Sequence, residues 1–358
     1  MKKIEQFIKN ILLKLLLLFN SSSSAFSEPQ FNQNSKILFI RLNKIGDALV
    51  STPLLKLIKD KTGADITVLA DAKNHFIFEN NSSVNKVFVF EKKLKNLLEL
   101  RRKIDKEKFD LVVDLHDDVS TTVSFMIASL NIKYKFGLKK DNDVIFTHTV
   151  EKLNPVTNHV VDRILNLGKL FHLHPENERL NIQYELKDLS IEKVEKSLSK
   201  YFNEKKFLIG INISAGSYSR FWGKQRFRKL IEFYQNYDTN IILLCSTHDI
   251  DKAQDISDNK LKIYYSPDFN VFSAMISKLD FLFTPDTSVI HIASAFKIPV
   301  FGIYVKYNTS DMIWAPYKSK FDCEITEDEN FDKLEFEDVK EKLKPFFEEI
   351  YEKRNSRL

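Results

Sequence analysis

Short apolar runs alternate along the chain with longer stretches in which apolar residues recur at helical spacing. We interpret the apolar runs as strands at residues 36–42, 65–70, 86–90, 110–116, 206–213, 240–245, 281–283 and 300–304. The intervening helices are expected at residues 47–61, 94–106, 120–130, 157–171, 225–237, from 249 onward, 289–296 and 335–351. Strands that are apolar throughout and alternate with helices pair in parallel, in a sheet covered on both faces. The pattern therefore predicts an α/β fold.

The order of these runs divides the chain into four segments, because the alternation of strand and helix starts again near residue 206. The predicted segments are residues 1–34, an apolar helix with a serine-rich linker; 35–186, the first α/β domain; 187–334, the second α/β domain; and 335–358, a terminal helix. In two-domain proteins of this kind such a helix commonly returns to the first domain. We therefore expect residues 335–358 to pack there.

The N-terminal segment has the pattern of a membrane-seeking helix. It carries Lys2, Lys3 and Lys9, and residues 11–19 are apolar except for Lys14. This run is shorter than the roughly 20 apolar residues that a membrane-spanning helix needs. We interpret residues 1–20 as a basic amphipathic helix that lies on the inner membrane surface. A secretory signal cleaved near residues 25–27, a short anchor and a disordered tail remain as alternatives.

The amino-acid composition excludes several classes of protein function. The 358 residues are 43% hydrophobic and 29% charged, as in soluble globular proteins, and they suffice for two domains. Two cysteines give neither a disulfide framework nor metal-ligand spacing, which suits a reducing cytoplasm. The net charge of +5 fits an anionic partner such as a nucleotide or a membrane, and it is far from a nucleic-acid-binding signature. Dinucleotide-binding and P-loop glycine patterns are absent.

Polar residues follow the predicted strand at 281–283. The turn Asp286-Thr287-Ser288 precedes a helix that contains His291, and either Asp286 or Thr287 can cap that helix. Ligands of open α/β sheets bind at the carboxyl ends of strands, where helix N-termini favour phosphates. A carboxylate would repel a bare phosphate, so a ligand that also offers hydroxyl groups fits better. The alternative is that Asp286 only caps the helix and His291 is a buried structural histidine.

Two further polar clusters follow other predicted strands. Gly46 and Asp47 end the loop after the first strand, where Asp47 is either a general base or a helix cap. The loop Ser214-Ala-Gly-Ser217 precedes Arg220 and Trp222. An arginine offers a planar fork of donors that suits phosphate oxygens, although Arg220 is equally explained as a solvated surface residue.

These three clusters resemble, in order and spacing, the motifs of glycosyltransferase family 9, the lipopolysaccharide heptosyltransferase family. Asp286-Thr287-Ser288-x-x-His291 is similar to the family signature Asp-Thr-Gly-x-x-His, with Ser288 in place of glycine. Gly46-Asp47 is similar to the family's opening motif. Arg220 stands where the family usually has lysine, and Gly223 replaces a proline after the tryptophan.

The resemblance implies a GT-B architecture, in which two Rossmann-like domains face each other across a cleft. It implies an inverting, metal-independent glycosyltransferase in which Asp47 is the general base. The implied donor-binding residues are Asp286, Thr287, Ser288, His291, Arg220, Lys224, Ser214, Gly216 and Asp249. The expected acceptor-binding residues are Gly46 and, because they end or follow the strand at 110–116 on the side of the cleft, His116 and Asp117.

The same resemblance implies the partners. The donor would be a nucleotide-diphosphate sugar, ADP-linked heptose in the family, and the acceptor a lipopolysaccharide-type glycolipid, with no further cofactor. No Asp-x-Asp metal motif follows a strand; residues 141–143 have that spacing but lie in a polar loop. We expect a cytoplasmic enzyme bound peripherally to the inner face of the membrane.

Two alternatives from other classes remain. A nucleotide-sugar epimerase on the same two-domain plan would release nucleotide without an acceptor. A catalytically inactive nucleotide-sugar-binding homologue would bind donor, and Asp47→Ala would change nothing measurable; Ser288 and Gly223 depart from the family pattern in its favour.

Overall fold

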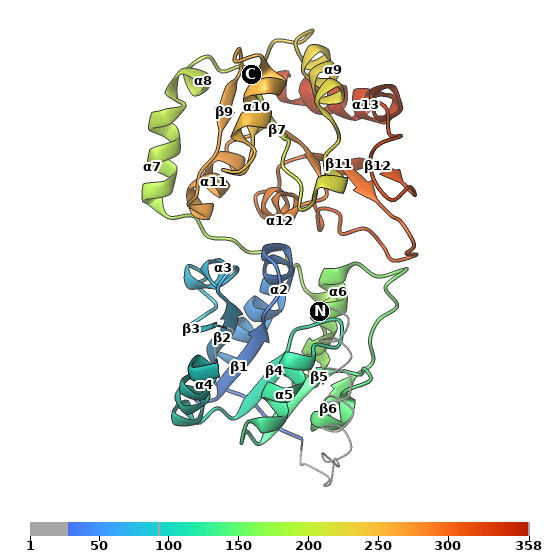
Figure 1. The fold of residues 1–358 in the computed structure, drawn as a ribbon. Helices are drawn as coiled ribbons and strands as arrows, with labels where there is room; N and C mark the ends of the chain where they lie inside the picture. Colours follow the sequence, from blue (N-terminus) through green and yellow to red (C-terminus); the bar gives the residue numbers. More distant parts are fainter. Residues whose placement is uncertain (1–27, 92–93, 357–358) are drawn as a thin grey trace. The chain divides into compact units, whose positions relative to one another are not determined.

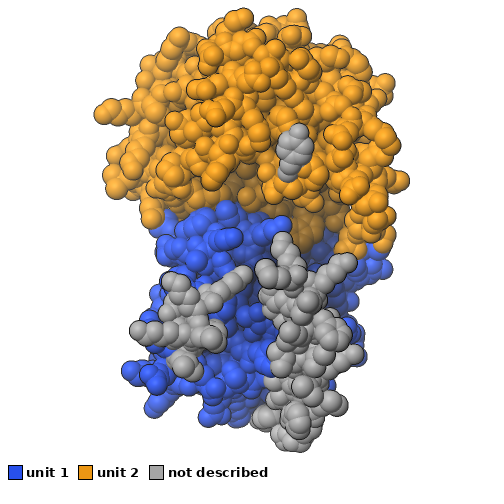
Figure 2. Space-filling view, viewed as in Figure 1, with its two compact units in different colours: residues 1–183 blue, residues 184–358 orange. Residues whose placement is uncertain are grey.

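The computed structural model describes residues 28–91 and 94–356, so the predicted membrane-seeking residues 1–20 lie outside the described part. The chain divides into two compact units, Met1–Gln183 and Tyr184–Leu358 (Figure 2). The boundary thus falls between Gln183 and Tyr184, close to the expected position after residue 186. Within the described residues, no helix combines the length and the apolar composition that crossing a membrane requires.

Unit 1 is built around a parallel sheet of six strands in the order β3-β2-β1-β4-β5-β6 (Figure 1). Its strands are β1 (Lys36–Arg41), β2 (Asp65–Asp71), β3 (Lys86–Phe90), β4 (Leu111–Asp114), β5 (Tyr134–Leu138) and β6 (His148–Val150). Its helices are α2 (Ile45–Thr62), α3 (Phe76–Glu79), α4 (Leu94–Glu107), α5 (Thr121–Ser129) and α6 (Val160–Leu165), with short 3₁₀ turns at Asp143–Ile145, Asn166–Phe171 and Pro175–Asn177.

Unit 2 repeats this plan with a parallel sheet of six strands in the order β12-β11-β10-β7-β8-β9. Its strands are β7 (Phe207–Asn212), β8 (Thr239–Leu244), β9 (Lys262–Tyr264), β10 (Phe281–Pro285), β11 (Val300–Val305) and β12 (Phe321–Thr326). Its helices are α7 (Asp188–Ser197), α8 (Ser199–Asn203), α9 (Lys224–Tyr234), α10 (Ile250–Ser257), α11 (Phe269–Ile276), α12 (Ser288–Ala295) and α13 (Phe336–Asn355), with a 3₁₀ turn at Tyr218–Arg220.

The two sheets have the same topology. In each, the first strand in sequence lies between the second and the fourth, which is the strand order of doubly wound nucleotide-binding folds. The point where the order reverses lies between β1 and β4 in unit 1 and between β7 and β10 in unit 2. Ligands of such sheets bind beside this switch point, at the carboxyl ends of the strands. The predicted α/β fold with parallel sheets is confirmed.

Four strands and several helices were not predicted. Strands β5, β6, β9 and β12 are short or carry polar residues at alternate positions, so they lack the continuous apolar runs of the central strands. The helix expected at 157–171 is α6 followed directly by a 3₁₀ turn. Strands β6, β9 and β12 are edge strands, which are only partly buried and less constrained in composition, whereas β5 lies inside its sheet but carries Lys135 and Gly137.

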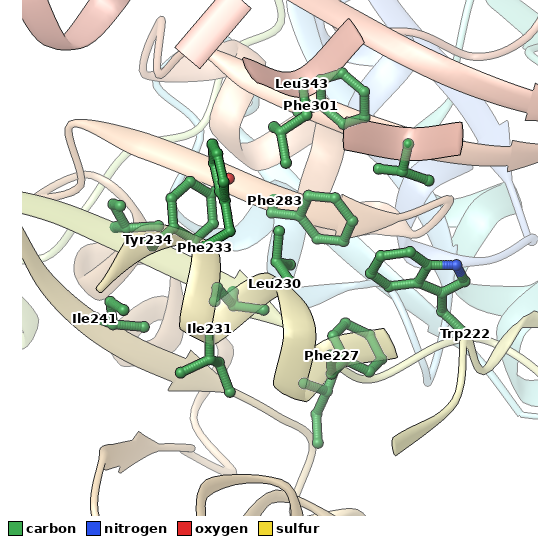
Figure 3. Close-up of a cluster of buried hydrophobic side chains, with 14 of the residues drawn as sticks. Trp222, Phe227, Leu230, Ile231, Phe233, Tyr234, Ile241, Phe283, Phe301 and Leu343 are labelled. Carbon is green, nitrogen blue, oxygen red and sulfur yellow. The ribbon is translucent and has the colours of Figure 1, made fainter. Parts of the chain in front are cut away.

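Each unit has its own hydrophobic core. In unit 1, Leu38 and Ile40 of β1 pack with residues of α4 and α5. The core of unit 2 is rich in aromatic residues, and Trp222 lies against Phe283 with ring centroids 5.3 Å apart (Figure 3). The indole N–H of Trp222 also donates to the carbonyl of Leu334 at 2.9 Å. This buried tryptophan therefore anchors the loop that follows β7.

The terminal helix α13 belongs to unit 2, which corrects the expectation that residues 335–358 pack on the first domain. Its residues Leu343, Phe346, Phe347 and Ile350 are part of the unit 2 core. The ring of Phe347 lies 5.7 Å from that of Phe207 in β7. The same core includes residues of α9 and of strands β7, β10 and β11, so the apolar residues of α13 are buried within unit 2.

Candidate functional site

Except for Asp249, which follows β8, the predicted site residues come after the four strands that flank the two switch points. In unit 1, Gly46 and Asp47 follow β1, and His116 and Asp117 follow β4. In unit 2, residues 214–220 follow β7 and residues 286–288 follow β10. Strand ends that are neighbours in a parallel sheet bring their following loops together. Each unit therefore gathers one group of polar residues at its switch point.

In unit 2, the turn after β10 is fixed by buried polar contacts. The Thr287 hydroxyl accepts the Val289 N–H at 3.3 Å, so Thr287 is the cap of α12 and Ser288 is its first residue. The side-chain amide of Asn212, at the end of β7, donates to the Thr284 hydroxyl at 2.9 Å and to the Thr287 hydroxyl at 3.4 Å. Because Thr287 caps the helix, Asp286 is not needed for that purpose.

Asp286 instead pairs with Arg220. The Arg220 Nη1 lies 2.9 Å from the Asp286 Oδ2, and the two side chains are 40% and 25% exposed. The pair joins the loop after β7 to the turn after β10, directly before the N-terminus of α12. An ion pair that is partly open to water can exchange one partner for a ligand at low cost, because exposed ion pairs contribute little stability.

Asp249 is the centre of a second polar group in unit 2. Its Oδ2 accepts the Ser214 hydroxyl at 2.6 Å and the Ser246 hydroxyl at 2.8 Å, and its Oδ1 lies 2.7 Å from the Lys252 ammonium. Burial acts to raise the pKa of Asp249, but the hydrogen bonds from Lys252, Ser214 and Ser246 outweigh it and lower that pKa. The carboxylate thus stays ionised and ready to accept further hydrogen bonds.

Three predicted donor-binding residues are not brought into these groups. The Lys224 ammonium pairs at 2.5 Å with Asp255 on α10. His291 is buried in α12, with its ring centroid 6.1 Å from that of Trp314. Gly216 lies on an exposed stretch of the loop, where an added Cβ would meet no atom within 4 Å. The group formed by the structure is therefore Arg220, Asp286, Thr287 and the Ser214–Asp249 pair.

In unit 1, Asp47 is held by a buried arginine. Asp47 lies in the first turn of α2 and not at its cap, which is Lys44. The Arg41 Nη2 donates to the Asp47 Oδ1 at 3.1 Å, and the Arg41 Nε donates to the Asp47 carbonyl at 2.9 Å. Arg41 is 1% exposed, whereas the Asp47 side chain is 17% exposed. The carboxylate is thus accessible while its supporting cation is not.

His116 is a structural residue, which corrects the expectation that it binds acceptor. Its Nε2 accepts the Leu42 N–H at 3.2 Å, and its Nδ1 lies 2.7 Å from the Asp114 Oδ1. The Leu42 contact requires Nε2 to be unprotonated, so the proton is on Nδ1 and the ring is neutral. Burial lowers the pKa of His116 in agreement, although Asp114 opposes this shift. With both nitrogens engaged and 2% exposure, the ring fixes the loop after β1.

Asp117 is paired with two cations. Its Oδ2 lies 3.0 Å from the Arg163 Nη1 and 3.5 Å from the Lys152 ammonium. Its side chain is 13% exposed, and Lys152 is 28% exposed. The position after β4 thus keeps a carboxylate and a cation at the surface of the unit. Gly46, the other predicted acceptor contact, lies in the first turn of α2 and is partly buried.

Several residues of these groups were not predicted. They are Arg41, Asn74, Asp114, Lys140 and Arg163 in unit 1, and Asn212, Ser246 and Thr284 in unit 2. One sequence signal was available for Arg41, because a charged residue inside an otherwise apolar strand is rarely buried without a partner. The others carry no distinctive spacing, because their roles depend on contacts between strands distant in sequence.

Potential metal ligands do not cluster, and Cys245 and Cys323 are free thiols, in the described part of the chain. There, no group of three or more histidine, cysteine, aspartate or glutamate residues is arranged to hold a metal ion. Cys245 is a buried free thiol, and burial raises its pKa to about 12. Cys323 is partly buried and likewise free.

Comparisons with known proteins point to one family. The family described as "Glycosyltransferase family 9 (heptosyltransferase)" matches residues 97–344. Lipopolysaccharide heptosyltransferase 3 of Escherichia coli (strain K12) is 24% identical over 296 residues, which cover 76% of this chain and 82% of that protein.

Two solved structures share the fold. The family 9 glycosyltransferase from Veillonella parvula DSM 2008 has a TM-score of 0.76 at 18% identity, covering 90% of this chain and 99% of that one. ADP-heptose LPS heptosyltransferase II of E. coli has a TM-score of 0.71 at 16% identity, covering 88% and 99%. The fold is thus the predicted two-domain GT-B fold.

Proposed function

Because the chain belongs to glycosyltransferase family 9, a heptosyltransferase family, we propose that it transfers heptose from an ADP-linked donor to a lipopolysaccharide-type acceptor. The names of its relatives support both partners, since one is a lipopolysaccharide heptosyltransferase and another is named for ADP-heptose. We propose further that the transfer inverts the anomeric centre and needs no metal ion or other cofactor.

The Arg220–Asp286 pair is the observation that carries the proposal. It lies at the switch point of unit 2, directly before α12, where a nucleotide diphosphate is favoured by free amides and by the helix dipole. The guanidinium would exchange part of its contact with Asp286 for the diphosphate. Asp286 would then accept a hydroxyl group of the donor sugar, and Asp249 would accept the ribose hydroxyls.

The reaction is a direct displacement. The acceptor hydroxyl gives its proton to the Asp47 carboxylate while its oxygen attacks the anomeric carbon. The bond from that carbon to the diphosphate oxygen breaks, and its electron pair leaves with the nucleoside diphosphate. Arg220 and the N-terminus of α12 stabilise the charge that builds on the leaving group, as a preorganised cation and amides do in other sites.

The acceptor and the membrane complete the proposal. Unit 1 would hold the glycolipid near Asp47, with the partly exposed Asp117 and Lys152 as further polar contacts. Residues 1–20 would place the enzyme on the inner face of the cytoplasmic membrane, where both nucleotide sugars and nascent glycolipids are available.

Calorimetry with ADP-, UDP- and GDP-linked sugars tests the donor site. We expect the wild type to bind the ADP-linked sugar and Asp286→Ala to bind it about 10- to 100-fold more weakly, because a charge-assisted contact is lost. Asp328→Ala is the matched control, since it removes another exposed carboxylate of unit 2 that pairs with a lysine, at 2.8 Å. The control should bind like the wild type.

Other outcomes have distinct meanings. If no nucleotide sugar binds, the transferase proposal fails. Nucleotide release from the bound donor without any acceptor would favour an epimerase. Donor binding without transfer, and without any effect of Asp47→Ala, would favour an inactive homologue.

A further inference from the structure

Arg41 is a buried cation at the end of a strand whose four central residues are apolar. It ends β1, where the preceding four residues are fully buried and hydrophobic, and its own side chain is 1% exposed. Burying a guanidinium costs free energy unless every donor finds a partner. The identity of these partners therefore indicates why an arginine stands at this position.

Two of the three hydrogen bonds that the Arg41 guanidinium donates go to Asp47. The Nε donates to the Asp47 carbonyl at 2.9 Å and the Nη2 donates to the Asp47 Oδ1 at 3.1 Å. The Nη1 donates to the Leu115 carbonyl after β4. One planar group thus ties the backbone and the carboxylate of Asp47 to both strands of the switch point.

The two oxygens of the Asp47 carboxylate are unequal. Oδ1 accepts from Arg41 and, at 3.4 Å, from the side-chain amide of Asn43. Among residues 28–91 and 94–356, no group donates a hydrogen bond to Oδ2. The arrangement therefore keeps one oxygen fixed and presents the other to a ligand.

The loop that carries Asp47 is held from two further strands. The Asn74 side-chain amide, after β2, donates to the carbonyls of Arg41 at 3.2 Å and Asn43 at 2.8 Å. His116, after β4, accepts the Leu42 N–H at 3.2 Å. The backbone on which Arg41 acts is therefore itself rigid, as a positioning contact requires.

We propose that Arg41 is a positioning residue that fixes the Asp47 carboxylate so that Oδ2 takes the proton of the acceptor hydroxyl. This inference rests on the proposed function, because it assumes that Asp47 is the general base. The proton moves from the hydroxyl oxygen to Oδ2 as that oxygen bonds to the anomeric carbon, while the nucleoside diphosphate leaves with the electron pair. Arg41 contacts no reacting atom.

The shape of the guanidinium is what matters. A lysine at position 41 would keep the positive charge among the surrounding carboxylates, but its single ammonium could not donate to the carbonyl and to Oδ1 in the same fixed geometry. The other charged groups near Arg41 are Asp114, Asp117, Asp118, Lys140 and Arg163, and the neutral ring of His116 is the remaining titratable group there. Arg41→Lys leaves the balance of these charges unchanged, so it isolates geometry from charge.

The test is a double-mutant cycle that combines Arg41→Lys with Asp47→Asn. The substrates are ADP-heptose and a truncated lipid A–core glycolipid, and the rate of ADP release is measured. In the wild-type background, we expect Arg41→Lys to lower kcat about 10- to 100-fold, as small misplacements of a catalytic group do, with little change in the donor KM. In the Asp47→Asn background the same substitution should change kcat little, because the group that it positions is gone.

Arg226→Lys is the matched control. Its guanidinium also joins backbone carbonyls to a carboxylate, donating to Trp222 at 2.8 Å and pairing with Glu335 at 2.8 Å, but it lies in unit 2 and contacts neither Arg41 nor Asp47. We expect it to keep the wild-type kcat. An effect of Arg226→Lys as large as that of Arg41→Lys would show a general loss of stability and would overturn the inference.

The remaining outcomes separate the inference from the proposed function. If Asp47→Asn retains activity, the assignment of the base fails and the inference with it. If Asp47→Asn is impaired but Arg41→Lys keeps kcat, or lowers it equally in both backgrounds, only the inference fails. Should Arg41→Lys not fold, Asp47→Glu keeps a carboxylate but shifts it out of register with Arg41; undiminished kcat in that variant overturns the inference.

Discussion

The switch points of the two units have the same topology but opposite electrostatic character. In unit 1, the polar group is built on the buried charges of Arg41, Asp114 and Lys140 and on the neutral ring of His116, and these side chains are all at most 4% exposed. In unit 2, the buried contacts are neutral, from Asn212 to Thr284 and Thr287, and the charged pair Arg220–Asp286 is partly open to water.

This difference indicates that the two groups of polar residues have different functions. Buried charges are held by several partners and cannot change them without a large penalty, so they fix a group in one orientation. A partly exposed ion pair gives up a partner at low cost, so it suits a charged ligand that must arrive and leave. A general base needs the first environment and a nucleotide-diphosphate site needs the second.

The comparison predicts that the largest effect comes from the carboxylate in unit 1. Asp47→Asn should lower kcat about 10²- to 10⁴-fold, because the amide cannot accept the acceptor proton. Donor affinity should stay near the wild-type value, since the donor site is assigned to unit 2. Steady-state ADP release and donor calorimetry on the same preparation measure both quantities. A large loss of donor affinity with unchanged kcat would contradict the assignment of the general base to unit 1 and would place Asp47 in the donor site instead.

The sequence was sufficient to predict the strands and helices that carry the site residues. It was insufficient to predict the side-chain contacts that hold those residues in place. Strands β1, β4, β7 and β10 were predicted because central parallel strands are apolar throughout, and a motif after a strand is placed at its carboxyl end. The sequence also predicted a helix cap at either Asp286 or Thr287, and the structure shows that the cap is Thr287.

The rest depended on packing between distant segments. His116 follows a strand at the switch point, so the sequence favoured a surface role, but the Leu42 N–H and Asp114 occupy both its nitrogens. Lys224 follows the donor loop but turns to Asp255. Helix α13 is amphipathic, and amphipathicity alone does not say which sheet it covers. In each case only the fold shows which partner is nearest.

The second prediction concerns the exposed pair of unit 2. Arg220→Ala should weaken binding of the ADP-linked sugar about 10- to 100-fold, since it removes charge-assisted hydrogen bonds to the diphosphate. The loss should shrink as salt is added, because the pair is exposed and screened. Calorimetry at two ionic strengths measures this. A loss independent of salt would indicate that the pair becomes buried on binding, which would weaken the contrast between the two units.

The smallest effect is expected from the pH dependence of stability, and it belongs to unit 1. Burial lowers the pKa of His116, so the folded protein binds its proton less readily than the unfolded chain does. The stabilisation from the neutral ring is therefore complete above the unfolded value of about 6.5 and is lost as the pH falls below it.

His116→Gln isolates this contribution, because a glutamine offers one acceptor for the Leu42 N–H and one donor for Asp114 at every pH. Between about pH 7 and about pH 5, the free energy of unfolding should fall further for the wild type than for this variant. Asp114 does not titrate in that range, because His116 and Lys140 outweigh the effect of burial and hold its pKa below the usual value. Denaturant unfolding at several pH values measures the difference, and amide exchange at Leu42 reports it locally. Parallel curves for the two proteins would mean that the ring carries no such stabilisation, and the buried charges of unit 1 would then be less rigid than the comparison requires.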